Sequence, residues 1–294
     1  MPPHAVCFGE ALWDVLPAGR QPGGAPFNVA VHLHQLGQPA RLISRVGDDD
    51  LGAELLAFLH ERGLNTDFVP RDQTQPTGVV EANVGNRNEV TYNIVQPVAW
   101  DYIGYEERLR RLVAEADMLV FGSLAARSPA TRETLYRLLP AARFRVFDVN
   151  LRPPHYAPEV VQHLLENSDL VKMNHHELTE ILGWLGRGEA DESALAWLAG
   201  RFELQAVCVT RGADGALLWT GGQLYRSPGV PVEVADTIGS GDAFLAALLV
   251  DWLAGQSPPQ GLRRACAAGA LVATQPGATP RISPADVAAL LATS

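Results

Sequence analysis

A glycine-rich turn at residues 236–244 carries the amides and side chains best suited to chemistry. It has the sequence DTIGSGDAF, with a strand-like run, VPVEVA, at 230–235 before it and a long apolar run at 243–255 after it. If the apolar run is a helix, unpaired amides and the helix dipole at its N-terminus bind an anion. Three amides would face outward there: Gly239, Ser240 and Gly241. Asp242 adds a carboxylate that faces the same space.

This turn could instead be a helix cap, a dinucleotide-binding turn or a lysine-containing phosphate loop. Ser240 or Asp242 could simply cap the helix, because both residue types are favoured N-caps. A dinucleotide-binding turn would need a third glycine where Phe244 stands. A lysine-containing phosphate loop is excluded, since the only lysine of the 294 residues, Lys172, lies in VKMN.

A second glycine turn, Gly23-Gly24, precedes a segment of helical periodicity. Glycines allow a small ligand to meet the backbone, and the side chain of Asn28 offers both a donor and an acceptor. Asp14 follows the first predicted strand, and ligands gather at the carboxyl ends of parallel strands. We predict that these residues hold a small polar ligand, although each feature alone also fits an ordinary turn.

Buried strand-like runs alternate with helical patterns along the chain. The predicted strands are residues 5–9, 40–46, 117–122, 143–148, 169–173 and 205–210. Pro26 and Gly37 bound one predicted helix, Leu51 starts the apolar stripe of another, and Pro129 opens a third that Pro140 closes. This alternation predicts one α/β domain over residues 1–294, with a mostly parallel sheet and helices on both faces.

The segment 73–100 departs from this pattern. It contains two alternating strand-like runs around Gly85-Asn86, a turn signal. The segment is predicted to form a hairpin that makes a small β lid with residues 12–22. The alternative is an ordinary surface hairpin.

Composition excludes several classes of partner. The formal net charge is −10 without a basic cluster, so nucleic acid is not expected. No apolar run of ~18 residues exists to span a membrane, and the N-terminus has no pattern of a secretory signal. Three widely spaced cysteines indicate a reduced, cytoplasmic protein.

Four segments together resemble the ribokinase-like, PfkB-type carbohydrate kinases. They are GEALWDVLP at 9–17, GGAPFNVAVHLHQLG at 23–37, DVNLR at 148–152 and DTIGSGDAF at 236–244. The first and third are most similar to the fructokinase branch. The resemblance implies a three-layer fold and ATP-dependent phosphorylation of a small sugar, with fructose first. Ribokinase, 2-keto-3-deoxygluconate kinase and nucleoside kinase are the alternatives within the family. A non-catalytic sugar sensor and an oxidoreductase are the alternatives outside it.

The resemblance also implies roles for single residues. Asp242 would be the base, beside the amides of Gly239, Ser240 and Gly241. The sugar would be held by Asp14, Gly23, Gly24, Asn28 and Arg152. The nucleotide would contact Asn174, Thr210, Gly212 and Gly215, and Mg²⁺ would lie near Glu177 and Asp148. From the spacing alone, Asn174 and Glu177 also fit a capping box at a helix start.

Three further expectations concern the ion, the lysine and the assembly. Some relatives bind a monovalent cation at positions matching Asp236, Ile238 and Gly277. Arg281 stands close to where a small hydroxyl residue would be expected, which argues against K⁺ here. Arg152 and Mg²⁺ would supply positive charge, so Lys172 is expected to be dispensable for catalysis. Exposed lid strands could pair two subunits into a homodimer.

Overall fold

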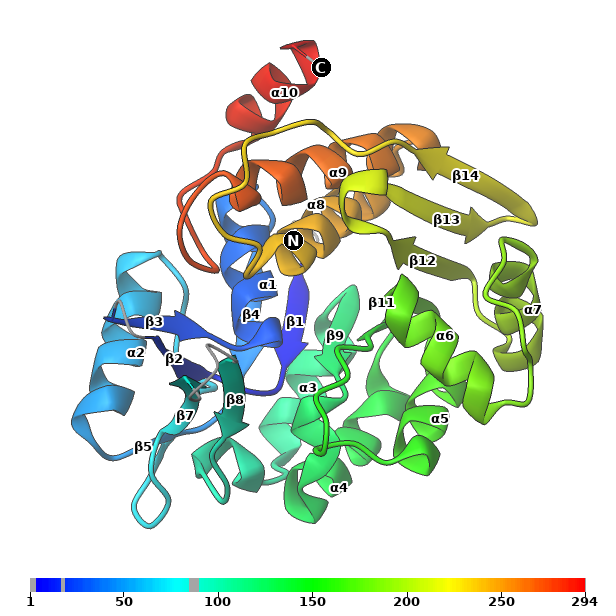
Figure 1. The fold of residues 1–294 in the computed structure, drawn as a ribbon. Helices are drawn as coiled ribbons and strands as arrows, with labels where there is room; N and C mark the ends of the chain where they lie inside the picture. The colour runs from blue at the N-terminus through cyan, green and yellow to red at the C-terminus, as the bar shows by residue number, and fades with distance from the viewer. Residues whose placement is uncertain (1–3, 17–18, 85–89, 294) are drawn as a thin grey trace.

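An eight-stranded sheet forms the centre of the computed structural model, which describes residues 4–16, 19–84 and 90–293 (Figure 1). The strand order is β14-β13-β12-β11-β10-β9-β1-β4. The six predicted strands are all present: β1 (Ala5–Phe8), β4 (Ala40–Ile43), β9 (Met118–Gly122), β10 (Arg145–Asp148), β11 (Leu170–Asn174) and β12 (Ala206–Thr210). These six are parallel. Two antiparallel strands that were not predicted, β13 (Ala216–Thr220) and β14 (Gln223–Ser227), extend the sheet.

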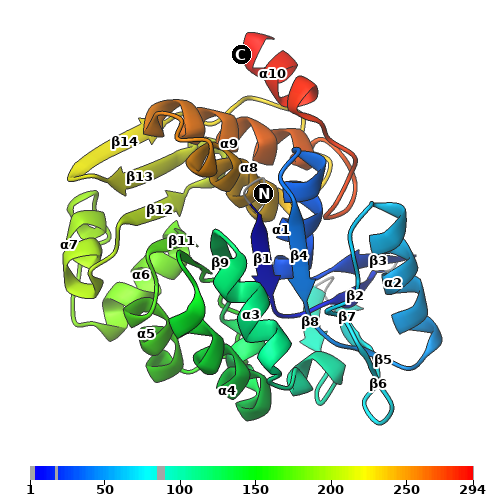
Figure 2. The same ribbon diagram turned by 180° about the vertical axis from the view of Figure 1, so that it is seen from behind.

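Helices cover both faces of this sheet (Figures 1 and 2), which confirms the predicted three-layer α/β fold. One face packs against α1 (Ala25–Gln35), α8 (Ser240–Leu253) and α9 (Pro258–Ala273), with α10 (Pro284–Thr293) beyond α9. The other face packs against α3 (Glu107–Glu115), α4 (Pro129–Leu138), α5 (Pro158–Glu166), α6 (His175–Trp184) and α7 (Ser193–Phe202). Both faces are buried, which is why the strands are continuous apolar runs without polar alternation.

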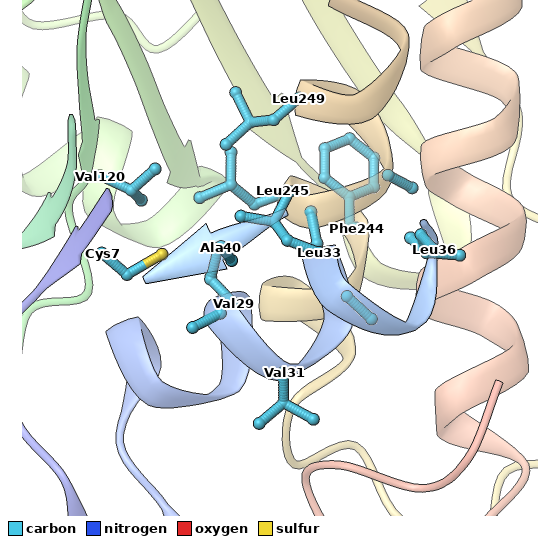
Figure 3. Close-up of a cluster of buried hydrophobic side chains, with 14 of the residues drawn as sticks. Cys7, Val29, Val31, Leu33, Leu36, Ala40, Val120, Phe244, Leu245 and Leu249 are labelled. Carbon is cyan, nitrogen blue, oxygen red and sulfur yellow. The ribbon is translucent and has the colours of Figure 1, made fainter. Parts of the chain in front are cut away.

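The packing of α1 against α8 brings the two glycine turns together. Figure 3 shows Leu33 of α1 near Phe244 and Leu245 of α8, in the same buried cluster as Val29 and the strand residues Cys7 and Val120. Gly24 is the N-cap of helix α1, and Gly37 follows its C-terminal end. Their φ angles, +110° and +87°, lie in the region that favours glycine. Because each glycine turn begins one of these packed helices, residues near 24 and near 240 lie at the same edge of the sheet.

A second sheet, of order β3-β2-β7-β8, lies beside the carboxyl end of β1 (Figure 1). Its strands are β2 (Leu12–Leu16), β3 (Gly19–Gly23), β7 (Gly78–Val84) and β8 (Val90–Ile94). They occupy both segments that were assigned to the lid, and the predicted Gly85-Asn86 turn lies outside the described residues. A short pair, β5 (Val46–Gly47) and β6 (Arg71–Asp72), leads into this region next to α2 (Asp50–Glu61).

The strand-like run at 230–235 does not form a strand. These residues join no sheet in the structure. Pro231 lacks the N–H that a ladder needs, and the next segment is held by α9, since the amides of Ala235 and Asp236 both donate to the Ala273 carbonyl. The remaining short elements are 3₁₀ turns: η1 (Ala99–Tyr102), η2 (Leu124–Arg127), η3 (Leu139–Ala141) and η4 (Gly212–Asp214). Within the described ranges, no helix has the length and apolarity to cross a membrane.

Candidate active site

The turn before α8 is built to leave its amides free. Helix α8 begins at Ser240, and its N-cap, Gly239, has φ +77° and no capping side chain. The structure therefore contradicts the alternative in which Ser240 or Asp242 serves only as a cap. The amides of Gly239 and Gly241 have no backbone acceptor among the described residues, whereas that of Ser240 lies 3.3 Å from the Thr237 carbonyl. Two free amides at a helix N-terminus form an anion site.

Asp242 is buried at this turn. Its side chain does not cap α8 and instead lines a cavity described below. Its Oδ2 accepts a 2.8 Å hydrogen bond from Nδ2 of Asn28. Burial raises the pKa of Asp242 to about 7, and the charge of Asp148 adds to the shift, while Lys172 and Asn28 oppose it. A carboxylate that titrates close to neutral pH is suited to general-base catalysis.

A cavity of about 400 Å³ collects the residues that were predicted to hold a small polar ligand. It is lined by Asp14, Gly24, Asn28, Arg152, Gly239, Gly241 and Asp242, together with Glu10, Leu12, Val80, Ile94 and Leu124. Strands β7 and β8 of the small sheet supply Val80 and Ile94. Gly23 is outside the lining, but a Cβ there would collide with the carboxylate of Asp14. Gly23 therefore leaves Asp14 the room to point into the cavity.

Glu10 is a cavity residue that the sequence analysis did not assign. Its side chain is buried, and Oε1 accepts a hydrogen bond from the Ala25 amide at 3.1 Å. The bond holds the start of α1 against the end of β1. Burial raises the pKa of Glu10 to about 7, although the Arg152 guanidinium opposes the shift. The position of Glu10 directly after β1, where ligands gather, was the signal available in the sequence.

A second cavity, of about 510 Å³, adjoins the first at Thr237 and Gly241. It is lined by Thr210, Gly212 and Gly215, the residues of the predicted nucleotide loop, and by Ser240 of the anion-binding turn. Gly215 has φ +81°, and a Cβ there would collide with the Ser227 carbonyl. The remaining walls of this second cavity are mostly apolar and come from Val230, Val232, Val234, Phe244, Cys266 and Ala270. An apolar slot joined to an anion-binding turn is suited to a flat base carrying phosphates.

Lys172 lies under the anion-binding turn. Its Nζ is 2.9 Å from Oδ1 of Asp148, its neighbour in register on β10. Burial alone would lower the pKa of Lys172, but the charges of Asp148, Asp242 and Glu177 outweigh it and raise that pKa. A Cβ on Gly241 would be only 3.1 Å from the same Nζ. Lys172 is thus a buried cation close to the carboxylates of Asp148, Asp242 and Glu177. The local sequence VKMN gives no sign of this environment.

Asn174 and Glu177 form the capping box that was the alternative to a metal role. Asn174 caps α6, and Oε2 of Glu177 accepts from the Asn174 amide at 2.8 Å. Oε1 of Glu177 accepts from the Leu151 amide at 3.0 Å. Neither residue lines the two cavities, and neither does Asp148. The assignment of Glu177 and Asp148 to Mg²⁺ therefore stays a prediction.

Known proteins resemble the chain over nearly its whole length. Residues 8–285 match the model of the pfkB family carbohydrate kinases. This chain is a pfkB-family carbohydrate kinase. Among curated kinases, a fructokinase of Klebsiella pneumoniae is 31% identical over 92% of this chain and 93% of that one.

Solved structures of other kinases share the fold. A double-mutant fructokinase of Vibrio cholerae, with bound fructose, ADP and potassium, aligns with a TM-score of 0.85 and 25% identity over 98% of each chain. An aminoimidazole riboside kinase of Salmonella enterica aligns with a TM-score of 0.82 and 26% identity over 98% of this chain and 99% of that one. A carbohydrate kinase needs a binding place for each of two substrates, and this chain has two adjoining cavities.

Proposed function

We propose that this pfkB-family kinase transfers the γ-phosphoryl group of ATP to a small sugar, and that the sugar is fructose. The observation that carries the proposal is the position of Asp242. Its carboxylate faces the polar cavity, where a sugar would bind, at the turn whose free amides separate that cavity from the apolar slot. This position would put Asp242 between the sugar hydroxyl and the phosphates of ATP.

The reaction follows from this placement. The adenine ring of ATP lies in the apolar slot, and the phosphates of ATP extend past Thr237 to the amides of Gly239 and Gly241. Asp242 accepts the proton of the sugar hydroxyl while that oxygen bonds to the γ-phosphorus and the bond to the ADP oxygen breaks. The amides stabilise the negative charge on the transferring group, because such transfers depend on positioning and electrostatics.

The charges of the polar cavity support an uncharged, hydroxyl-rich acceptor. Three carboxyl groups, those of Glu10, Asp14 and Asp242, face a single guanidinium, that of Arg152. An acidic sugar would add a further negative charge, which disfavours 2-keto-3-deoxygluconate. Fructose is favoured over ribose and nucleosides because several curated relatives are named fructokinases and a similar structure holds fructose with ADP.

Mg²⁺ would enter with ATP and neutralise part of the phosphate charge. The described residues include no group of three or more His, Cys, Asp or Glu side chains that could hold a metal. This fits an ion carried by phosphates and waters with one or two carboxylates. Asp148 is the residue that fits best, since its Oδ2 has no hydrogen-bond partner in the described structure. Both carboxylate oxygens of Glu177 already accept hydrogen bonds from backbone amides, those of Leu151 and Asn174. We therefore propose that Glu177 holds these two segments in place and does not bind the metal.

We infer that K⁺ is not required for activity. Both carboxylate oxygens of Asp236 already accept amides of the relevant loop, Oδ1 from Ile238 at 3.0 Å and Oδ2 from Gly277 at 3.1 Å. Arg281 is turned outward and pairs with Glu61 at 3.0 Å. Replacing KCl by tetramethylammonium chloride in the assay should leave kcat unchanged. A strict dependence on K⁺ would contradict this inference.

We also propose that the small sheet is a lid and that it pairs two subunits. Val80 and Ile94 contribute to the polar cavity from the lid strands. Among the described residues, the outer strands of this sheet, β3 and β8, each pair with one neighbouring strand, so the other edge of each is available to a second copy. Sedimentation equilibrium at several concentrations tests the dimer. A monomer throughout would contradict it.

The decisive experiment is a panel of acceptors with MgATP in which ADP release is followed. Fructose should give the highest kcat/KM among fructose, ribose, 2-keto-3-deoxygluconate and a nucleoside. Higher kcat/KM for another acceptor would overturn the fructose assignment but keep the kinase. ATP binding without turnover on any acceptor would favour a non-catalytic sensor.

A further inference from the structure

His32 is a buried histidine of α1 whose ring contacts Ala278, the residue that lies against Gly239 of the anion-binding turn. Its side chain has no exposed surface, and Nε2 lies 2.9 Å from the carbonyl oxygen of Ala278. Since a carbonyl oxygen can only accept, Nε2 carries the proton in this contact. Nδ1 has no hydrogen-bond partner within the described residues. The ring therefore makes one directed hydrogen bond, and that bond ends on Ala278.

The carbonyl of Ala278 lies directly against Gly239. A Cβ on Gly239 would collide with that oxygen and would be 2.6 Å from the Ala278 Cα. Gly239 is the N-cap of α8 and the first residue of the amide turn. The position of the Ala278 carbonyl therefore limits where the Gly239 amide can lie.

Two other contacts hold the same loop on either side of Ala278. The Gly277 amide donates to Asp236 at 3.1 Å, and the Thr279 carbonyl accepts from Arg62 at 3.0 Å. His32 supplies the contact between them, at the residue that touches Gly239. Burial lowers the pKa of His32 to about 4, with Arg62 adding to the effect, so the ring stays neutral near pH 7.

The same helix also holds the base. Asn28 lies one helical turn before His32, and residues four apart share a face of a helix. Asn28 donates to the carboxylate of Asp242 at 2.8 Å. One face of α1 thus contacts Asp242 directly and the Gly239 amide through Ala278.

We propose that His32 is a positioning residue, which fixes the anion-binding amides relative to the base through its hydrogen bond to Ala278. The inference rests on the proposed kinase function. Loss of the bond should let the 277–279 loop and Gly239 shift, so that the amides no longer meet the charge that develops during transfer. Small misplacements of such groups cost ~10-fold to ~10²-fold in rate.

The test compares three variants of the full-length enzyme. His32→Leu removes the donor, and His32→Gln keeps a donor at the end of a side chain of similar reach. His34→Leu is the matched control, because His34 is exposed on the same helix two residues later. For each variant, kcat, the KM for sugar and ATP, and the melting temperature are measured. We expect His32→Leu to lose at least ~10-fold in kcat with both KM values within ~3-fold, and His32→Gln to recover most of the loss.

The outcomes separate the proposals. A folded His32→Leu enzyme with normal kcat and only a lower melting temperature would reduce His32 to a packing residue. Equal loss in His32→Leu and His32→Gln would also contradict the hydrogen-bond role. If His32→Leu does not fold, ¹⁵N shifts of the wild-type ring decide, since the Nδ1–H tautomer would contradict the contact. A wild type without ATP turnover would instead contradict the proposed function.

Discussion

Asn28 and Asp242, 214 positions apart in the sequence, are joined by a 2.8 Å hydrogen bond from the side-chain amide to the carboxylate. Each residue belongs to one of the two glycine signatures, so this bond links them physically. The bond favours the ionised form of Asp242, because a donor stabilises a carboxylate. The cavity wall at Asn28 and the proposed base, Asp242, are therefore joined directly.

Replacing Asp242 by Asn should abolish most of the activity while leaving ATP binding intact. The amide cannot accept a proton, and loss of a general base typically costs ~10²–10⁴ in rate. ATP affinity should stay the same or rise, because a negative charge beside the phosphates is gone. Steady-state kinetics and calorimetric ATP titration check this, with Asp286→Asn on the exposed side of α10 as control. A folded variant within about threefold of wild-type kcat would refute the base assignment.

The acid side of the pH–rate profile should report Asp242. Its pKa is raised to about 7, so kcat/KM should fall as the pH drops below that value and the carboxylate becomes protonated. In Asn28→Ala, the lost hydrogen bond should raise this pKa further and move the acid limb to higher pH. An unchanged limb would mean that the profile reports another group.

The ligand-free protein should lose stability as the pH rises toward neutrality. Burial raises the pKa values of Glu10 to about 7 and of Asp14 to about 6. The folded state therefore binds more protons than the unfolded state between the ordinary carboxyl range and pH ~7, so the free energy of unfolding declines through this window. Urea titrations at several pH values measure it. Glu10→Gln should flatten the decline, and an identical slope in this variant would exclude Glu10 as a source.

Asp14→Ala should weaken sugar binding and spare the nucleotide. Asp14 lines the polar cavity only. A hydrogen bond to a charged group contributes about 1.5–3 kcal/mol, so the KM for sugar should rise ~10–150-fold. Calorimetric titration with sugar and with ATP checks both affinities. Weakened ATP binding with unchanged sugar binding would place Asp14 in the other site.

Lys172→Met is now expected to be far more damaging than the sequence suggested. The substitution leaves Asp148 buried without its partner, and breaking a buried ion pair costs about 3–5 kcal/mol. Urea unfolding measures the loss, and the double variant Lys172→Met with Asp148→Asn should recover part of it. Arg281→Met, which breaks an exposed pair, should cost less than ~1 kcal/mol. A fully stable, active Lys172→Met enzyme would support the original expectation that this lysine is dispensable.

The difference between local and distant contacts explains what the sequence could reveal. Gly239 and Asp242 were predictable because a glycine turn and the helix that follows form an anion site within a few residues. The pairing of Lys172 with Asp148 was not, because it depends on the register of β10 and β11. His32 depends on a partner 246 positions away. The strand-like pattern at 230–235 did not indicate a strand, because an alternating apolar pattern also fits a segment that lines a cavity.

The burial of Lys172 has a consequence for chemical labelling. The chain has one lysine, its side chain is only 5% exposed, and it lies beneath the anion-binding turn. Amine-directed reagents, including acetylating agents and common fluorophore esters, thus meet no exposed lysine side chain on the folded protein. Any modification of Lys172 must pass through a state in which the site has opened. The rate of its acylation would therefore report how often the site opens in solution, and bound ATP should slow it.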